Sequence, residues 1–338
     1  MKLALLTLSA MCVLLWCGIA SAQDTAYSHA YSVAGINSPI TVFTGAPEGF
    51  DPTTASDEEL QSYGYPRRPD LNDAKAYTVW ERAVSTQRIT PELVGNSNRF
   101  HRPNNILAIG ATVNNTTNVQ SGNWSGYSLV NGTPKFDEVV GLWVVPNVGS
   151  QFSSITGYSS MWVGIDGNCK CNDLIQDGTE QQWTGGKASY YAWIEFIPQA
   201  EVPIKNFPVQ PGDVIYAYSA VVTKSGKIYG YYYMANFNTR LSVSASIAMP
   251  SGDVYSGESA EWVVERTEVG GSFNNPLPYY AYAYMDDAWA FRSGSSHAID
   301  YLSEANQNIT MVDSGGTKLS KAYEQDGDSM WFEWLAYK

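Results

Sequence analysis

Four short runs rich in aromatic and β-branched residues follow one another in the second half of the chain, and they restrict what it can fold into. The runs are YYAWIEFIP, DVIYAYSAVVT, GYYYMANF and RLSVSASIAM, which begin at Tyr190, Asp213, Gly230 and Arg240. Between and after them lie PGD, KSGK and PSGD, residues that turns favour. Short β-prone runs at this spacing predict an all-β fold, an antiparallel β-sandwich of two packed sheets, and about 200 residues suffice for one such domain.

The first 22 residues have the pattern of a secretory signal peptide. Lys2 supplies the positive start, LALLTLSAMCVLLWCGIA the apolar centre, and Ala20-Ser21-Ala22 a small-residue cleavage site. The alternative, a permanent membrane anchor, is less favoured because the apolar stretch is only marginally long for a span. We therefore expect a secreted, extracellular protein that has no membrane contact once the signal is removed.

Residues 23–120 differ in character from the remainder. They contain Pro-rich pieces, one predicted helix (LNDAKAYTVWERAVSTQ, from Leu71) and a cluster of arginines between Arg67 and Arg102. They end in the polar run GATVNNTTNVQSG, which predicts an exposed linker. The sequence thus divides into a signal peptide (1–22), a pro-segment with linker (23–120) and a β-sandwich domain (121–338).

Charge and composition exclude several kinds of chemistry. With 20 basic and 33 acidic residues the formal net charge is -13, which disfavours nucleic acid as a partner. The histidines are His29, His101 and His297, and neither a HExxH zinc motif nor a G-x-S-x-G nucleophile motif accompanies them. We expect no metal and no other cofactor. The pair Cys169 and Cys171 in CKC leaves a disulfide, free thiols or a metal ligand pair as alternatives.

The run VDSGG, Val312–Gly316, resembles the Asp-Ser/Thr-Gly signature of aspartic peptidases. Those enzymes need two aspartates that share a proton, and only one copy is present. Asp313 and the two glycines are typical of a turn between strands. The sequence therefore predicts a turn here and a protein insensitive to pepstatin.

The run AEWVVE places Glu261 and Glu265 on one face of a predicted strand, since side chains alternate along a strand. Carboxylates among apolar residues in a sheet suggest a binding or catalytic cleft. From the residues alone three functions stay open: an acid peptidase, a lectin-like carbohydrate binder, and a glycosidase that pairs Glu265 with Glu195 or Asp166.

Several motifs in order carry a resemblance to a known family. They are SGNWSGY (from Ser121), MWVGIDGNCKCNDLIQDG (from Met161), YYAWIEFIP and AEWVVERTE (from Ala260), and the likeness extends to about Trp334. Together they resemble the eqolisins, a family of glutamic peptidases. The resemblance implies a concanavalin A-like sandwich with curved sheets, and a secreted acid endopeptidase made as a zymogen.

The resemblance also implies the roles of individual residues. Gln176 and Glu265 occupy the positions of the catalytic pair, and Trp124, Trp162, Asp166 and Glu195 those of residues that line or support the cleft. A carboxylate can take a proton from water and later return it to the leaving nitrogen, while an amide can orient that water and donate to the oxyanion. The expected partners are protein or peptide substrates and the chain's own pro-segment as inhibitor, and we expect a monomer.

Two departures from the family pattern limit what can be transferred. Tyr191 stands where the family has an aspartate, and the CKC insertion has no counterpart, so cleavage preference is not inferred. In the pro-segment we expect arginines to pair with cleft carboxylates near neutral pH and to separate when acid protonates them.

Overall fold

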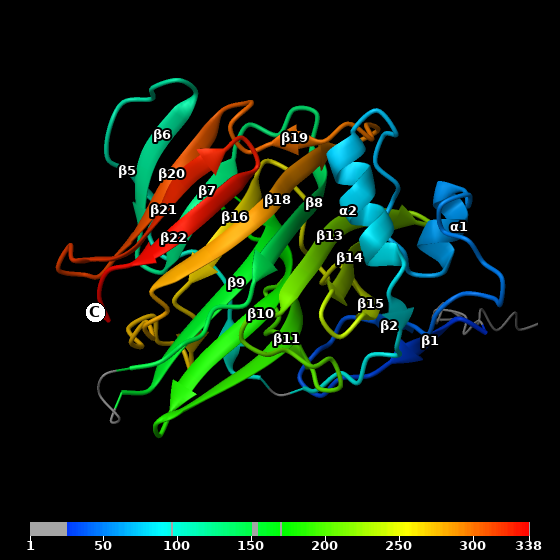
Figure 1. The fold of residues 1–338 in the computed structure, drawn as a ribbon, viewed down its shortest axis with the longest axis horizontal. Coiled ribbons are helices and arrows are strands. Elements are labelled where there is room, and N and C mark those ends of the chain that lie inside the picture. Colours follow the sequence, from blue (N-terminus) through cyan, green and yellow to red (C-terminus); the bar gives the residue numbers. More distant parts are fainter. Residues whose placement is uncertain (1–25, 96, 151–154, 170, 338) are drawn as a thin grey trace, which may run out of the picture.

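The structure is a computed structural model that describes residues 26–95, 97–150, 155–169 and 171–337, and its regular structure is nearly all β (Figure 1). Two large sheets pack face to face. They are joined where β20 passes from one sheet to β21 of the other. The predicted antiparallel β-sandwich is confirmed.

The first sheet carries the predicted site residues. Its strands, in spatial order, are β12 (Val202–Ile204), β11 (Lys187–Ile197), β10 (Leu174–Thr184), β9 (Gly157–Ile165), β16 (Ala260–Glu265), β7 (Trp124–Leu129), β20 (Asn306–Val312) and β6 (Thr116–Ser121). All of these pairings are antiparallel except β20 with β6.

The second sheet is built in the same way. Its order is β21 (Lys318–Asp326), β22 (Ser329–Trp334), β18 (Tyr282–Arg292), β8 (Phe136–Val144), β13 (Val214–Lys224), β14 (Lys227–Asn236), β15 (Leu241–Ala248), β2 (Ile40–Phe43) and β1 (Ser28–Tyr31). Short strands complete the set: β3 (Gln87–Arg88), β4 (Arg99–Phe100), β5 (Leu107–Ala108), β17 (Glu268–Val269) and β19 (Ile299–Asp300).

Strand alternation separates the core between the sheets from the two outer faces. Along β13, Ile215 and Ala217 belong to the cluster between the sheets, whereas Tyr216 and Tyr218 point the opposite way into a second cluster. Both faces of this strand are therefore buried, and so its sequence reads as an almost continuous apolar and aromatic run.

Two helices lie in the N-terminal part. The predicted helix is α2 (Ala74–Val84), and α1 (Asp57–Ser62) begins with a capping box in which Ser56 and Glu59 satisfy each other's backbone N–H groups. Figure 1 shows α2 lying across the outer face of the second sheet. No helix in the described ranges is long and apolar enough to span a bilayer.

The linker prediction is partly wrong. Residues 110–115 are exposed, but residues 116–121 form β6 and pair in register with β20. The polar composition of this stretch hides the pairing, because β6 satisfies the backbone groups along one edge of β20 and buries only Val119 and Ser121. The predicted turn at VDSGG is confirmed, since Gly315 N and Thr317 N donate to Asp313 Oδ1 between β20 and β21.

Candidate active site

Five predicted site residues meet on the outer face of the first sheet. Gln176 lies opposite Glu195 on β11, and Glu265 on β16 lies opposite Trp124 on β7. Trp162 projects from β9, the strand between β10 and β16. Their side chains are fully buried, and the sheet thus brings together residues that are far apart in the sequence.

A glycine next to Gln176 allows this crowding. Gly164 lies directly across from Gln176 on β9, and a Cβ at this position would come within 3.1 Å of the Gln176 Cβ and 3.0 Å of the Trp162 ring. Both neighbours are fixed by packing, so a larger residue would displace the glutamine or the indole.

The amide of Gln176 is oriented by two acceptors. Its Nε2 donates to Glu195 Oε2 at 2.6 Å and to the backbone carbonyl of His101 at 2.6 Å. Its Oε1 is buried and has no hydrogen-bond partner among the described residues. The amide can therefore donate to one carbonyl oxygen and accept from another group at the same time.

The carboxylate of Glu265 is held from three sides. Oε1 accepts from Asn123 Nδ2 at 2.8 Å, and Oε2 accepts from Trp162 Nε1 at 2.8 Å and lies 3.0 Å from His101 Nδ1. Burial raises the pKa of Glu265 above its usual range, although the charge of His101 opposes that shift. A carboxylate with a raised pKa is a better proton acceptor than a solvated one.

His101 belongs to a stretch that runs across the site, residues 97–105, which we call the covering segment. Within it β4 pairs antiparallel with β17, which follows Glu265 closely in the chain. The His101 backbone N–H donates to Glu195 Oε2 at 3.1 Å, while its carbonyl accepts from Gln176. The segment thus bonds to Gln176 and Glu195 through the backbone C=O and N–H of a single residue, His101.

The His101 ring fills the space next to Glu265. It stacks on Trp193 with ring centres 3.8 Å apart, and its Nε2 lies 2.8 Å from Glu201 Oε2. Burial disfavours the charged ring, but Glu265 and Glu201 outweigh that effect and hold the pKa of His101 well above its usual range. The charged ring therefore bridges two buried carboxylates.

Two of the predicted arginines lie beside cleft carboxylates. Arg102 forms a two-point bond with Glu268 at 2.7 and 2.9 Å, and Arg99 lies within 3.9 Å of Glu180 and Glu201. Arg67 instead pairs with Glu138 on the second sheet. Arg99 and Arg102 of the covering segment thus lie beside carboxylates, whereas Arg67 has a partner on the second sheet, and release of the arginines in acid stays a prediction.

Trp124 packs edge-on against Trp162 with ring centres 4.8 Å apart. The two further acids have other surroundings. Asp166 is not brought to Gln176, because its carboxylate accepts from the backbone N–H groups of residues 256–258 ahead of β16. Glu261 is also buried, and it accepts from Ser128 Oγ and the Asn168 backbone rather than from any residue near Glu265.

Sequence reasoning missed His101, Asn123 and Glu201. The histidine stands in RFHRP between two arginines, but its carboxylate partners are distant in the sequence. Tyr191, which replaces the family's aspartate, donates its hydroxyl to Glu201 Oε1 at 2.7 Å. In this chain Glu201 therefore provides an acidic group beside the position that Tyr191 occupies.

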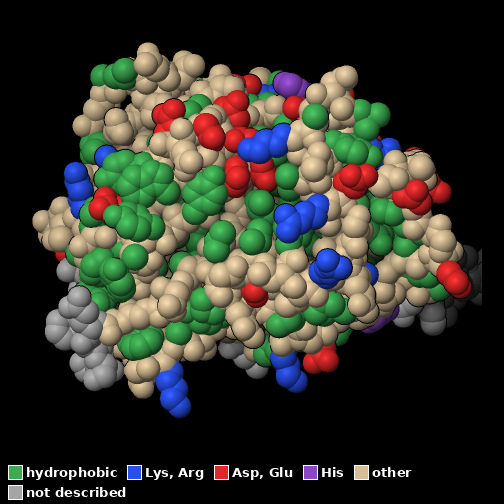
Figure 2. Space-filling view, viewed as in Figure 1, with side chains coloured by type: hydrophobic (Ala, Val, Ile, Leu, Met, Phe, Trp, Pro, Cys, Tyr) green, Lys and Arg blue, Asp and Glu red, His purple; other side chains and the backbone are tan. Residues whose placement is uncertain are grey.

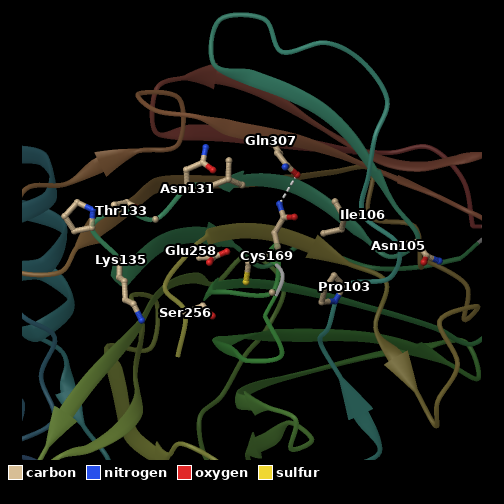
Figure 3. A pocket seen from close by; sticks show the side chains of 15 residues that line it. Pro103, Asn105, Ile106, Asn131, Thr133, Lys135, Cys169, Ser256, Glu258 and Gln307 are labelled. Atoms are coloured by element: carbon tan, nitrogen blue, oxygen red, sulfur yellow. Dashed lines mark hydrogen bonds between the residues drawn. The ribbon is translucent and has the colours of Figure 1, made fainter. Parts of the chain in front are cut away.

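A groove of about 1020 Å³ continues from the covering segment (Figure 3). Pro103 and Ile106 form part of one wall, and Glu258, Lys135 and Gln307 line other parts. Cys169, on the adjoining turn, is joined to Cys171 by a disulfide in the structure. Neither Gln176 nor Glu265 lines this groove, so it lies beside the predicted catalytic pair rather than around it.

Asp177, next to Gln176 on β10, points into the core between the sheets. Its Oδ1 accepts from Ser219 Oγ at 2.8 Å, while Oδ2 has no partner among the described residues. Burial raises the pKa of Asp177 to about 8. The buried acid therefore stabilises the fold fully below its ordinary pKa, and that contribution is lost as pH rises toward about 8.

We expect Asp177→Asn to raise stability near neutral pH and to change it little near pH 4. The amide keeps the acceptor for Ser219 but cannot ionise. The free energy of unfolding therefore no longer falls by up to about 1.4 kcal/mol per pH unit between the ordinary pKa of aspartate and about 8. Thermal unfolding at about pH 4 and pH 7 measures the effect, with the exposed Glu324→Gln as control. Equal gains or losses at both pH values would show that Asp177 is not the titrating group.

Comparisons with known proteins place these features in context. Residues 122–333 match the Peptidase A4 family. Aspergillopepsin-2 from Aspergillus niger is 30% identical over 179 residues, which cover 47% of this chain and 61% of that protein. Scytalidopepsin B from Scytalidium lignicola is 27% identical over 212 residues, 60% of this chain and 77% of that protein. The chain thus spans about three fifths of aspergillopepsin-2.

Solved structures agree on the fold. The crystal structure of scytalido-glutamic peptidase with a transition state analog inhibitor matches with a TM-score of 0.51 and 22% identity. The match covers 63% of this chain and 98% of that one. A second structure of the same peptidase with a peptide-based analog matches equally well, with a TM-score of 0.51 and 21% identity.

Proposed function

The chain belongs to the Peptidase A4 family, and from that premise we propose that it is a glutamic endopeptidase, active in acid and secreted as an inactive precursor. Glu265 is the general base, Gln176 binds the oxyanion, and Glu195 and Trp162 position them. Protein and peptide chains are the substrates, and the covering segment is the built-in inhibitor.

One observation carries the proposal, and it concerns His101. The amide of Gln176 donates to the His101 carbonyl, while the carboxylate of Glu265 is hydrogen-bonded to the His101 ring. The His101 carbonyl stands for the scissile carbonyl of a substrate. The Nδ1 of the ring stands where a water bound to Glu265 would be.

The chemistry follows from these positions. Glu265 takes a proton from water as the water oxygen bonds to the substrate carbonyl carbon, and Gln176 Nε2 donates to the oxygen that becomes negative. The unpartnered Oε1 of Gln176 accepts the second hydrogen of that water. Glu265 then returns its proton to the peptide nitrogen as the C–N bond breaks.

Glu195 is a positioning residue for the amide. Burial raises its pKa well above its usual range, despite the charge of His101, so Glu195 is protonated in acid. A protonated carboxyl still accepts one N–H of Gln176 through its carbonyl oxygen. It therefore fixes the orientation of the amide without competing with Glu265 as base.

The same geometry accounts for an inactive precursor. His101 is bonded to Glu265 and Glu201, so no water can reach the base. The pKa of His101 is raised, so its charged ring stabilises the bound covering segment, and this stabilisation is lost as pH rises through the raised pKa. Despite burial, the hydrogen bond from His101 lowers the pKa of Glu201, whose contribution is lost as pH falls through the lowered value. Inhibition is therefore strongest between the ordinary pKa values of glutamate and histidine, about 4.3 and 6.5, and it weakens as pH falls below that window.

Protein digestion by the purified, acid-treated protein tests the proposal. We expect it to degrade a denatured protein at about pH 3–5 and to leave polysaccharides intact and unbound. Release of reducing sugar, or polysaccharide binding without protein degradation, would instead support the glycosidase or lectin-like alternatives.

A further inference from the structure

The outer face of the second sheet is rich in aromatic side chains. These residues project away from the core between the sheets: Tyr216, Tyr218, Tyr231, Tyr233, Phe237, Trp289 and Phe291. They are nevertheless buried. Burial on an outer face requires a cover, which the chain's own N-terminal residues supply.

The cover consists of α2 and its neighbours. Ala76 and Ala83 of α2 and Phe43 of β2 belong to the same apolar cluster as the aromatic residues. The hydroxyl of Tyr233 donates to the Ala83 carbonyl at 2.8 Å. Arg88 places its guanidinium 4.6 Å from the ring of Tyr233. Helix and sheet are therefore packed together as in a domain core.

Backbone pairing adds to this contact at two edges. β2 extends the second sheet, with Val42 opposite Ala245 and Ile40 opposite Ile247 on β15. At the edge of the first sheet, the Val94 N–H donates to the Pro203 carbonyl at 3.0 Å. Residues 26–95 thus satisfy backbone groups at one edge of each sheet.

Charged pairs reinforce the same contact. Arg67 pairs with the buried Glu138 on β8. The ammonium of Lys75 lies 2.8 Å from Asp328 and 3.2 Å from Asp286. Figure 2 shows acidic and basic side chains gathered on this face of the molecule, where α2 meets β18. Removing residues 26–95 would leave these carboxylates without their cations.

The stretch that follows is bound differently. The covering segment reaches the site mainly through polar contacts, and beyond it Ile109 and Val113 are 53% and 64% exposed. Exposed loops are the preferred sites of proteolytic cleavage. Two cuts, one on each side of the covering segment, would release it from the cleft and leave residues 26–95 in place on the second sheet.

We propose that maturation removes only the covering segment and the exposed linker, and that residues 26–95 stay bound as a non-covalent second chain. That the chain is cut at all rests on the proposed function. That residues 26–95 stay bound after the cut rests on the packing alone. Without residues 26–95, seven large aromatic side chains would share one outer face, whereas the largest apolar patch on a typical monomer is only about 300–600 Å².

The test uses the full chain from Gln23 with the inactivating Glu265→Gln substitution, so that the result does not depend on the enzyme's own activity. Recognition sites for a sequence-specific protease are inserted at position 96 and between Gly110 and Ala111. After both cuts, size-exclusion chromatography and mass spectrometry under native conditions report whether residues 23–95 elute with residues 111–338.

We expect the two fragments to elute together and to separate only in denaturant. Elution of residues 23–95 by themselves, whether the remainder stays soluble or aggregates, would overturn the proposal. A matched pair of substitutions on α2 sharpens the result. Ala83→Arg puts a charge into the apolar contact and should release the segment, whereas Glu81→Arg on the exposed side of the same helix should not. Release by neither or by both would contradict the assigned contact.

Discussion

The processed enzyme carrying Glu265→Gln is expected to lose kcat/KM for a peptide substrate by a factor on the order of 10³. The substitution keeps the shape of the side chain and its bond from Trp162 but removes the proton acceptor, and general base catalysis accounts for about 10² to 10⁴ in rate. Gln176→Ala should cost on the order of 100-fold or more, because one oxyanion donor is lost.

The control for both variants is Glu261→Gln. Glu261 lies on the same strand and the same face as Glu265 and is equally buried, but its contacts are Ser128 and Asn168. It should retain most of the activity if the variant is folded by circular dichroism. Near-normal turnover by Gln176→Ala, or an equal loss in Glu261→Gln and Glu265→Gln, would refute the assigned roles.

A precursor carrying His101→Ala is expected to hydrolyse peptides before any cleavage, at least about 30-fold faster than the wild-type precursor near pH 5.5. Truncating one member of a buried, hydrogen-bonded charge pair costs about 2–5 kcal/mol. Each 1.4 kcal/mol lowers the occupancy of the site by the covering segment about tenfold. Without the imidazole, Glu265 and Glu201 become accessible to water. The backbone bond from Gln176 and the pair of Arg102 with Glu268 remain.

Initial rates on a quenched fluorescent peptide measure this effect, with a gel of the same sample to show that the precursor is intact. His297→Ala serves as the control, because that ring is exposed and its neighbour is Asp73 rather than a cleft residue. If the intact His101→Ala precursor stays as inactive as the wild type, the imidazole is not what blocks the base.

The strands could be predicted because the signal that marks them is local. Each run of β-branched and aromatic residues in β11, β13, β14 and β15 lies between turn residues, and burial on both faces makes the runs continuous. The strand β6 could not be predicted in this way. Its polar residues are ordered by the edge of β20, which is nearly 200 positions later in the chain.

The site shows the same division. Gln176 and Glu265 can be predicted as a pair because each lies in a motif of adjacent residues that resembles a family pattern. His101 was not found, because its importance comes from Glu195, Glu201 and Glu265, which are 94, 100 and 164 positions away. A histidine between two arginines carries no local sign that the folded sheet surrounds it with carboxylates.

The pH dependence of kcat/KM for an uncharged peptide tests whether a glutamate is the catalytic base. Already processed enzyme is used, and circular dichroism confirms the fold at each pH. We expect a maximum in acid, with an ascending limb set by ionisation of Glu265 and a fall toward neutral pH as a needed proton among the cleft acids is lost. A maximum at about pH 7 or above, with the protein still folded, would contradict a mechanism in which a glutamate and a glutamine cleave the peptide bond.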